Sequence, residues 1–129
     1  MGNFSDELSQ RYLLFATYIM KFEKQLCKNY SGRHIYGQLF RAGTSAGANY
    51  EEARAAESKA DFIHKMQLVL KELRESSFWI KLITTAKLIT HEDGALFLLQ
   101  NESTELSSIT AKSVLTAKSN SIKSTTKHN

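Results

Sequence analysis

The sequence predicts an all-α protein, an antiparallel four-helix bundle with up-down-up-down topology. Its 129 residues contain no proline, and because proline interrupts helices, this absence favours long ones. Apolar residues recur at alternating spacings of four and three, which is the period of an amphipathic helix. The apolar content of 42% is sufficient for a core, and short groups of turn-forming residues separate the periodic segments.

The first helix is expected from about Ser5 to Lys28 and the second from about Arg33 to Glu57, with a turn at Asn29 to Gly32. The apolar positions predicted for the first helix are Leu8, Tyr12, Phe15, Ile19, Phe22 and Leu26. Those predicted for the second are Ile35, Leu39, Ala42, Ala46, Asn49 and Ala53.

A capping box from Ser58 to Asp61 predicts the start of the third helix, which should end near Ile89. Its predicted apolar positions are Phe62, Met66, Val69, Leu73, Ser76, Ile80 and Ile83. A second capping box from Thr90 to Asp93 predicts a fourth helix that frays before Ser119. Its apolar positions are Leu96, Leu99, Leu106 and Ile109.

We therefore expect one domain over residues 1–119, followed by a flexible basic tail at 120–129 whose few apolar residues cannot offset the entropy of ordering. A single cysteine permits no intramolecular disulfide and indicates a reducing compartment, so we expect a cytoplasmic protein. The longest uncharged apolar stretch, from Tyr12 to Met20, is too short for a membrane span.

Three features of the sequence are possible sites of chemistry. Gly43 and Gly47 lie one helical turn apart, but no Gly-Lys-Ser or Gly-Lys-Thr follows them, so close helix packing is favoured over a phosphate-binding loop. Ser45 and Asn49 are expected to be structural polar residues of the core. One Asp-x-x-His spacing is too little for a di-metal centre, and we expect neither a cofactor nor catalysis.

The second half of the third helix is apolar around nearly its whole circumference. A helix of a monomeric bundle normally buries one stripe, so this segment predicts self-association through Phe78, Trp79 and Leu82. The alternative is that the fourth helix or the first turn of the same chain covers Phe78 and Trp79.

The chain carries 17 Lys and Arg against 13 Asp and Glu, a net charge of +4. The third helix holds six cations against three acids, and residues 106–129 contain no acid. Such basic patches favour polyanion binding, although ordinary solvated lysines, with Lys71 pairing to Glu75, would give the same composition. The candidate nucleic-acid-binding residues are Arg41, Lys59, Lys65, Lys71, Arg74 and Lys81.

The central stretch strongly resembles the bacterial four-helix bundle proteins encoded in 23S ribosomal RNA intervening sequences. The resemblance rests on RAGTSAGANYEEA from Arg41 to Ala53, ESKADFIHK from Glu57 to Lys65, KELRE from Lys71 to Glu75, and Trp79. It extends more weakly to Glu102 and Glu105-Leu106. The resemblance implies a cytoplasmic bundle, cyclic homopentamers among relatives and no recognised enzymatic activity. Distant relatives are the accessory variability determinants of diversity-generating retroelements, which form basic pentamers and engage nucleic acid and a reverse transcriptase.

Two functions follow as hypotheses. The first is a non-enzymatic homo-oligomer, a pentamer by resemblance, that binds RNA or DNA through repeated basic patches. The alternative is a protein-interaction scaffold without nucleic-acid binding, in which charge serves solubility alone.

Overall fold

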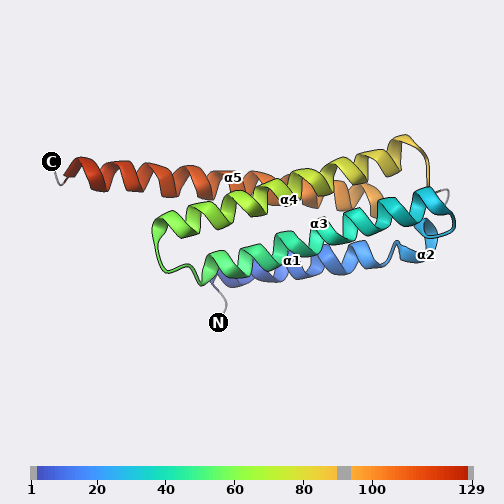
Figure 1. Ribbon diagram of the computed structural model, residues 1–129, viewed down its shortest axis with the longest axis horizontal. Coiled ribbons are helices and arrows are strands. Elements are labelled where there is room, and N and C mark those ends of the chain that lie inside the picture. Colours follow the sequence, from blue (N-terminus) through green and yellow to red (C-terminus); the bar gives the residue numbers. More distant parts are fainter. Residues whose placement is uncertain (1–2, 90–93, 128–129) are drawn as a thin grey trace.

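The computed structural model describes residues 3–89 and 94–127, with side chains described as far as Asn120. Within these residues it contains five helices and no strand: α1 (Phe4–Met20), α2 (Glu23–Leu26), α3 (Tyr30–Arg54), α4 (Lys59–Thr85) and α5 (Ala95–Lys127). The four long helices run antiparallel to their chain neighbours, and α2 is a single turn at one end (Figure 1). The predicted all-α four-helix bundle is confirmed.

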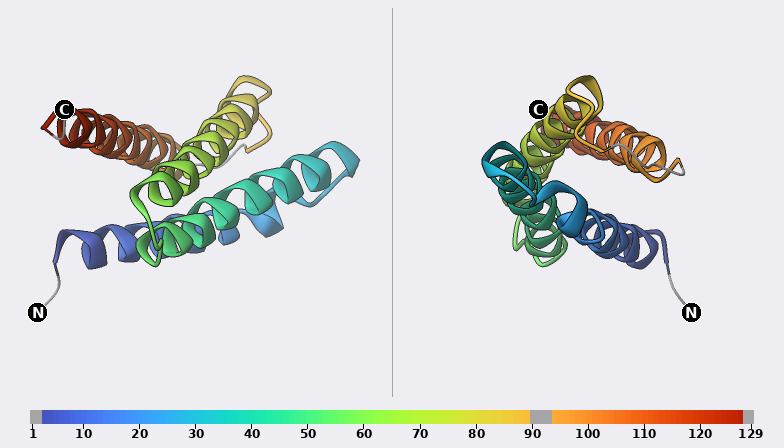
Figure 2. Two further views of the ribbon diagram at one scale, coloured as in Figure 1. Left: turned by 60° about the vertical axis from the view of Figure 1, so that its left-hand side comes forward. Right: turned by 90° about the vertical axis from the view of Figure 1, so that its right-hand side faces the viewer.

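Neighbouring helices around the bundle do not pack equally. α4 lies between α3 and α5 and packs extensively on both, and α1 packs on α3. The contact between α1 and α5, which would close the ring, is much sparser. The end-on view in Figure 2 shows the four helices at the corners of the bundle with this side open between the α1 and α5 backbones.

The expectation of one continuous helix from Ser5 to Lys28 is wrong, because the chain breaks after Met20 and resumes as α2. At the break the amides of Lys21 and Phe22 bond to carbonyls three residues back, those of Tyr18 and Ile19. These bonds tighten the backbone locally, as in a 3₁₀ turn. Phe22 and Leu26 remain buried, so the core face survives the break.

Side-chain caps fix the starts of the helices. The Ser58 hydroxyl accepts the Asp61 amide at 3.0 Å and caps α4, as the sequence predicted. The Asn29 side chain accepts the amide of Gly32 at 2.8 Å, so α3 begins at Tyr30, earlier than expected. Gly32 has no alternative here, because a Cβ at this position would overlap the carbonyl oxygen of Leu26.

The predicted apolar positions form the core with three exceptions. All six positions of the first predicted helix are buried, and so are the α4 positions from Met66 to Ile83. Asn49 is only half-buried, and Tyr50 takes its place in the core. Likewise Thr110 is buried where Ile109 was expected, and Phe62 is half-buried.

The last two helices end at other residues than the sequence predicted. α4 ends at Thr85, before the expected Ile89, whereas α5 continues past Ser119 to Lys127. The second predicted capping box, residues 90–93, lies outside the described residues, and the flexibility expected of residues 120–129 stays a prediction. Among the described helices, none combines the length and apolar character that crossing a bilayer requires.

Candidate nucleic-acid interface

Three of the six predicted binding residues lie together. Lys71, Arg74 and Lys81 are exposed on α4, on the side of that helix opposite its buried Leu73 and Ile80. Their spacings of three and seven residues put them along one face. We call these three residues the basic stripe. Within the described part of the chain, no carboxylate lies within ion-pair distance of any of them.

Arg41 has a different place, between α3 and α4. Its guanidinium forms ion pairs with Glu72, at 3.2 Å, and with Glu75. The Trp79 indole nitrogen donates to the same Glu75 carboxylate at 3.3 Å. Glu75 is therefore engaged by α3, and the described residues show no Lys71–Glu75 ion pair. Arg41 thus neutralises the acids next to the basic stripe and is not a free cation itself.

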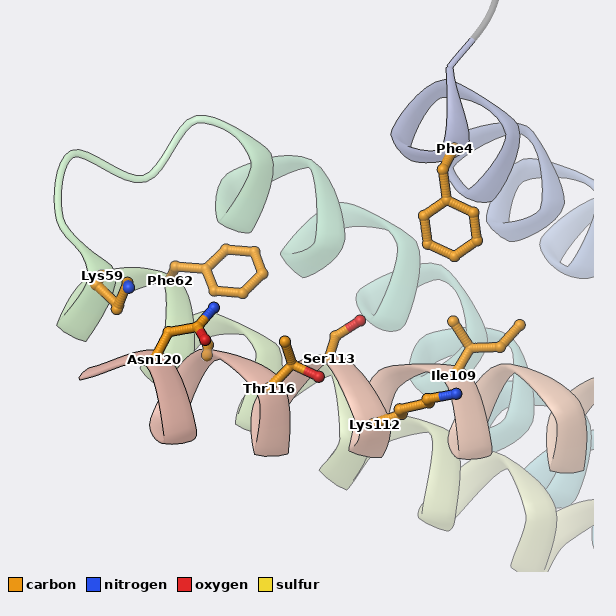
Figure 3. A pocket seen from close by; sticks show the side chains of 9 residues that line it. Phe4, Lys59, Phe62, Ile109, Lys112, Ser113, Thr116 and Asn120 are labelled. Atoms are coloured by element: carbon orange, nitrogen blue, oxygen red, sulfur yellow. The ribbon is translucent and has the colours of Figure 1, made fainter. Parts of the chain in front are cut away.

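Lys65 and Lys59 are separate from the stripe. Lys65 is half-buried, and its spacing of six residues from Lys71 puts it on another face of α4. Lys59, at the helix start, lines an open groove of about 670 Å³ where the ends of α1 and α4 approach α5. Phe4, Phe62 and Ile109 are its large apolar lining residues, and Lys59 and Lys112 stand at its margins (Figure 3).

The three predicted interface residues differ in exposure. Phe78 has 56% of its surface exposed, whereas Trp79 and Leu82 are half-buried and pack against the core. The Trp79 ring meets His34 of α3 edge to face at a centroid distance of 6.1 Å. His34 of α3, an element that the alternative did not name, therefore covers part of Trp79, and Phe78 stays exposed.

Other exposed apolar side chains were missed from the sequence. They include Leu13 and Met20 on α1 and Phe97, Leu98 and Leu115 on α5. None of these five residues is among the predicted apolar positions of its helix. A large apolar residue outside those positions is the sequence signal that could have identified them.

The polar residues assigned to the core are at its edge. Ser45 and Asn49 are half-buried, and neither side chain makes a hydrogen bond to another described residue. The fully buried polar side chains among the described residues are instead Ser76, Ser103 and Thr110. The close packing expected at Gly43 is present, because a Cβ there would overlap the end of the Ile19 side chain.

Shifted pKa values occur away from the basic stripe, where α1 meets its neighbours. Burial raises the pKa of the Tyr12 hydroxyl, which is hydrogen-bonded to the Thr110 hydroxyl at 2.7 Å. Hydrogen bonds from Arg11 to Glu102, at 2.9 and 3.1 Å, raise the pKa of that guanidinium. Both groups join α1 to α5, so their shifts reflect packing between helices.

The basic stripe presents three exposed cations that no described carboxylate pairs with. Surface cations without partners attract phosphate by charge, and their separation along a helix face suits an extended polyanion better than one small ligand. In the described ranges, no group of three or more histidine, cysteine, aspartate or glutamate side chains is placed to hold a metal ion.

Comparison with known proteins gives a consistent result. The profile of the family described as 23S rRNA-intervening sequence protein matches residues 6–112. A crystal structure of a protein of unknown function from the S23 ribosomal protein family of Bacteroides thetaiotaomicron is 30% identical, with a TM-score of 0.75. The match covers 85% of this chain and 96% of that one. No curated protein matches. The profile spans most of the chain, and the chain belongs to the family of 23S rRNA-intervening sequence proteins.

Proposed function

We propose that this protein is a non-enzymatic nucleic-acid-binding bundle whose basic stripe contacts the phosphate backbone of RNA or DNA. The observation that carries the proposal is the pairing pattern on α4. Arg41 engages Glu72 and Glu75, and no described carboxylate pairs with Lys71, Arg74 or Lys81. A protein that needed these cations only for solubility would gain from pairing them with the adjacent acids.

Binding through phosphate contacts has a defined signature. Each phosphate neutralised by a cation releases condensed counterions, so log affinity falls with log salt by about 0.9 per contact on duplex and about 0.7 on single strands. Such contacts position the protein without reading sequence, so we expect little sequence selectivity.

Self-assembly would multiply the stripe. By resemblance to its relatives we propose a cytoplasmic homopentamer, in which five copies of the stripe would present a larger positive field to a polyanion. Exposed apolar side chains on α1 and α5 support assembly, because Met20 has 54% and Phe97 67% of its surface exposed.

The test is fluorescence anisotropy of a labelled RNA hairpin titrated with the full-length protein at several salt concentrations. We expect a steep fall of log affinity with log salt. The triple variant Lys71→Ala, Arg74→Ala, Lys81→Ala should bind more weakly and with a shallower slope, because it loses phosphate contacts.

The control removes the same charge elsewhere. The variant Lys24→Ala, Lys28→Ala, Lys118→Ala changes three exposed cations outside the stripe, so its affinity should stay closer to that of the unchanged protein. Equal losses from the two triple variants would show that net charge alone attracts RNA. An affinity that does not change with salt would contradict the proposal.

A protein-interaction scaffold is the second candidate. The exposed Leu13 on α1 and Leu98 and Leu115 on α5 favour it, since these side chains lie on other helices than the basic stripe of α4. If the protein binds no hairpin even at low salt, these surfaces become the place to look for a protein partner.

A further inference from the structure

An exposed aromatic ring, that of Phe78, lies between two residues of the basic stripe. Phe78 lies between Arg74, one turn earlier, and Lys81, one turn later, so the ring and the cations share the outer face of α4. With 56% of its surface exposed, Phe78 does not belong to the core, unlike its neighbours Trp79 and Leu82.

The Phe78 ring is held in place by its contact with Trp79. Its centroid lies 5.0 Å from that of Trp79, with the two planes at 74°, an edge-to-face contact. Trp79 is fixed by its hydrogen bond to Glu75, and Glu75 by its ion pair with Arg41. This chain of contacts limits the entropy that Phe78 would lose on binding a ligand.

Neither Arg74 nor Lys81 makes a cation–π contact with the Phe78 ring. Among the described residues, the cation over an aromatic ring is Lys21 over Tyr18, so neither Arg74 nor Lys81 covers Phe78. The ring is free to stack while the stripe holds phosphates.

Resting on the proposed function, we infer that this face of α4 binds unpaired nucleotides, with Phe78 stacking on a base and the basic stripe holding the flanking phosphates. Base–aromatic stacking next to a positively charged surface is how proteins hold single strands without reading sequence. The bases of a duplex are stacked on each other and give a protruding ring no free face. The preferred ligand is therefore a single strand or a loop of RNA or DNA.

The experiment compares an unstructured RNA oligonucleotide with a blunt RNA duplex of the same length, at one salt concentration. The single strand should bind more tightly. Phe78→Leu keeps an apolar side chain but removes the ring, and should weaken single-strand binding by about 5- to 100-fold. Duplex affinity and the salt slope should not change, and Phe78→Tyr should restore single-strand binding.

A direct readout and a matched control complete the test. A 2-aminopurine base in the single strand should lose fluorescence on binding the unchanged protein, and keep it with Phe78→Leu. Phe97 is at least as exposed, at 67%, but stands on α5 in a segment without cations. Phe97→Leu should therefore leave the ratio of single-strand to duplex affinity and the loss of 2-aminopurine fluorescence unchanged, even where it alters assembly.

The ways to fail are distinguishable. If neither probe binds at low salt, the proposed function fails together with this inference. If both probes bind but Phe78→Leu weakens neither, or weakens both equally, only the inference is overturned. It is also overturned if sedimentation shows that Phe78→Leu dissociates an oligomer, because Phe78 would then be a contact between subunits.

Discussion

Helix α1 contacts its two neighbours in opposite ways. Towards α3 it packs closely, with Ile19 over Gly43 and the Tyr12 ring stacked on Tyr50 at 5.0 Å. Towards α5 the contact is sparser, and its polar contacts are the Tyr12–Thr110 hydrogen bond and the ion pairs of Arg11. Polar contacts occur on the α3 side as well, where Arg54 pairs with Asp6 and Tyr50 bonds to Ser5, so the two interfaces differ in how closely the helices pack.

The difference follows from the composition of the partner helices. α3 offers Ala42, Gly43 and Ala46, which are buried and let α1 approach closely. α5 buries the hydroxyls of Ser103 and Thr110, and of these two Thr110 has a hydrogen-bond partner among the described residues whereas Ser103 has none. The first interface therefore gains more dispersion from close packing than the sparser second one, where the Tyr12–Thr110 hydrogen bond makes a smaller net contribution.

The largest expected effect is on the close-packed side. Phe15 is fully buried near Gly43, and Phe15→Ala should cost about 3–5 kcal/mol because it leaves a cavity. Val114→Ala, on α5, removes only two methylene equivalents and should cost about 1–2 kcal/mol. Urea unfolding followed by the fluorescence of the single tryptophan, at fixed protein concentration, gives both values. A loss below about 2 kcal/mol for Phe15→Ala would show that the surrounding side chains collapse into the cavity and that this side is not closely packed.

Gly43 and Gly47 of α3 offer a finer test of the same interface. A Cβ on Gly47 would lie 3.4 Å from the Tyr12 Cβ, an ordinary contact, whereas one on Gly43 would overlap Ile19. Both changes to alanine gain about 1 kcal/mol in helix propensity, but overpacking at Gly43 costs about 1–3 kcal/mol. Thermal unfolding should rank Gly47→Ala above Gly43→Ala. The reverse order would show that Ile19 moves aside without cost.

The sequence predicted the close-packed side well. Six apolar positions from Leu8 to Leu26 and the seam of α4 were identified because one buried face leaves a period of three and four. The pattern could not decide between Asn49 and Tyr50, which are adjacent, since the choice depends on the Tyr12 ring across the interface. The break after Met20 comes from tightened backbone bonds, which leave no mark in composition.

The candidate site was predictable only as a set of charges. Composition and spacing identified the cations of α4, but not which of them have partners. Whether Arg41 reaches Glu72 and Glu75 depends on the alignment of α3 against α4, which is a tertiary property. The same holds for Trp79, whose cover by His34 comes from a residue 45 positions earlier in the chain.

A smaller effect is expected at Ser103 of α5. The buried hydroxyl of Ser103 has no hydrogen-bond partner among the described residues. Ser103→Ala removes this unpaired group and raises helix propensity, so it should stabilise the fold by about 1 kcal/mol. Urea unfolding measures the change. A loss of stability would show that the hydroxyl is paired in solution, and that the interface is better satisfied than its contacts indicate.

The smallest effect concerns the residue that joins the two interfaces, because Tyr12 stacks on α3 through its ring and bonds to α5 through its hydroxyl. Burial raises the folded-state pKa of Tyr12 above the unfolded value, about 10. As the pH rises, the unfolded state releases this proton first, so stability present below about pH 10 is lost above it.

Between about pH 8 and about pH 10 the loss attributable to Tyr12 should be about 0.4 kcal/mol. Tyr12→Phe cannot ionise, so urea unfolding at the two pH values should show a smaller decrease for this variant. Its stability at the lower pH reports separately the hydrogen bond to Thr110, about 1 kcal/mol. If the two proteins lose stability in parallel, the Tyr12 hydroxyl is accessible to water in the folded protein.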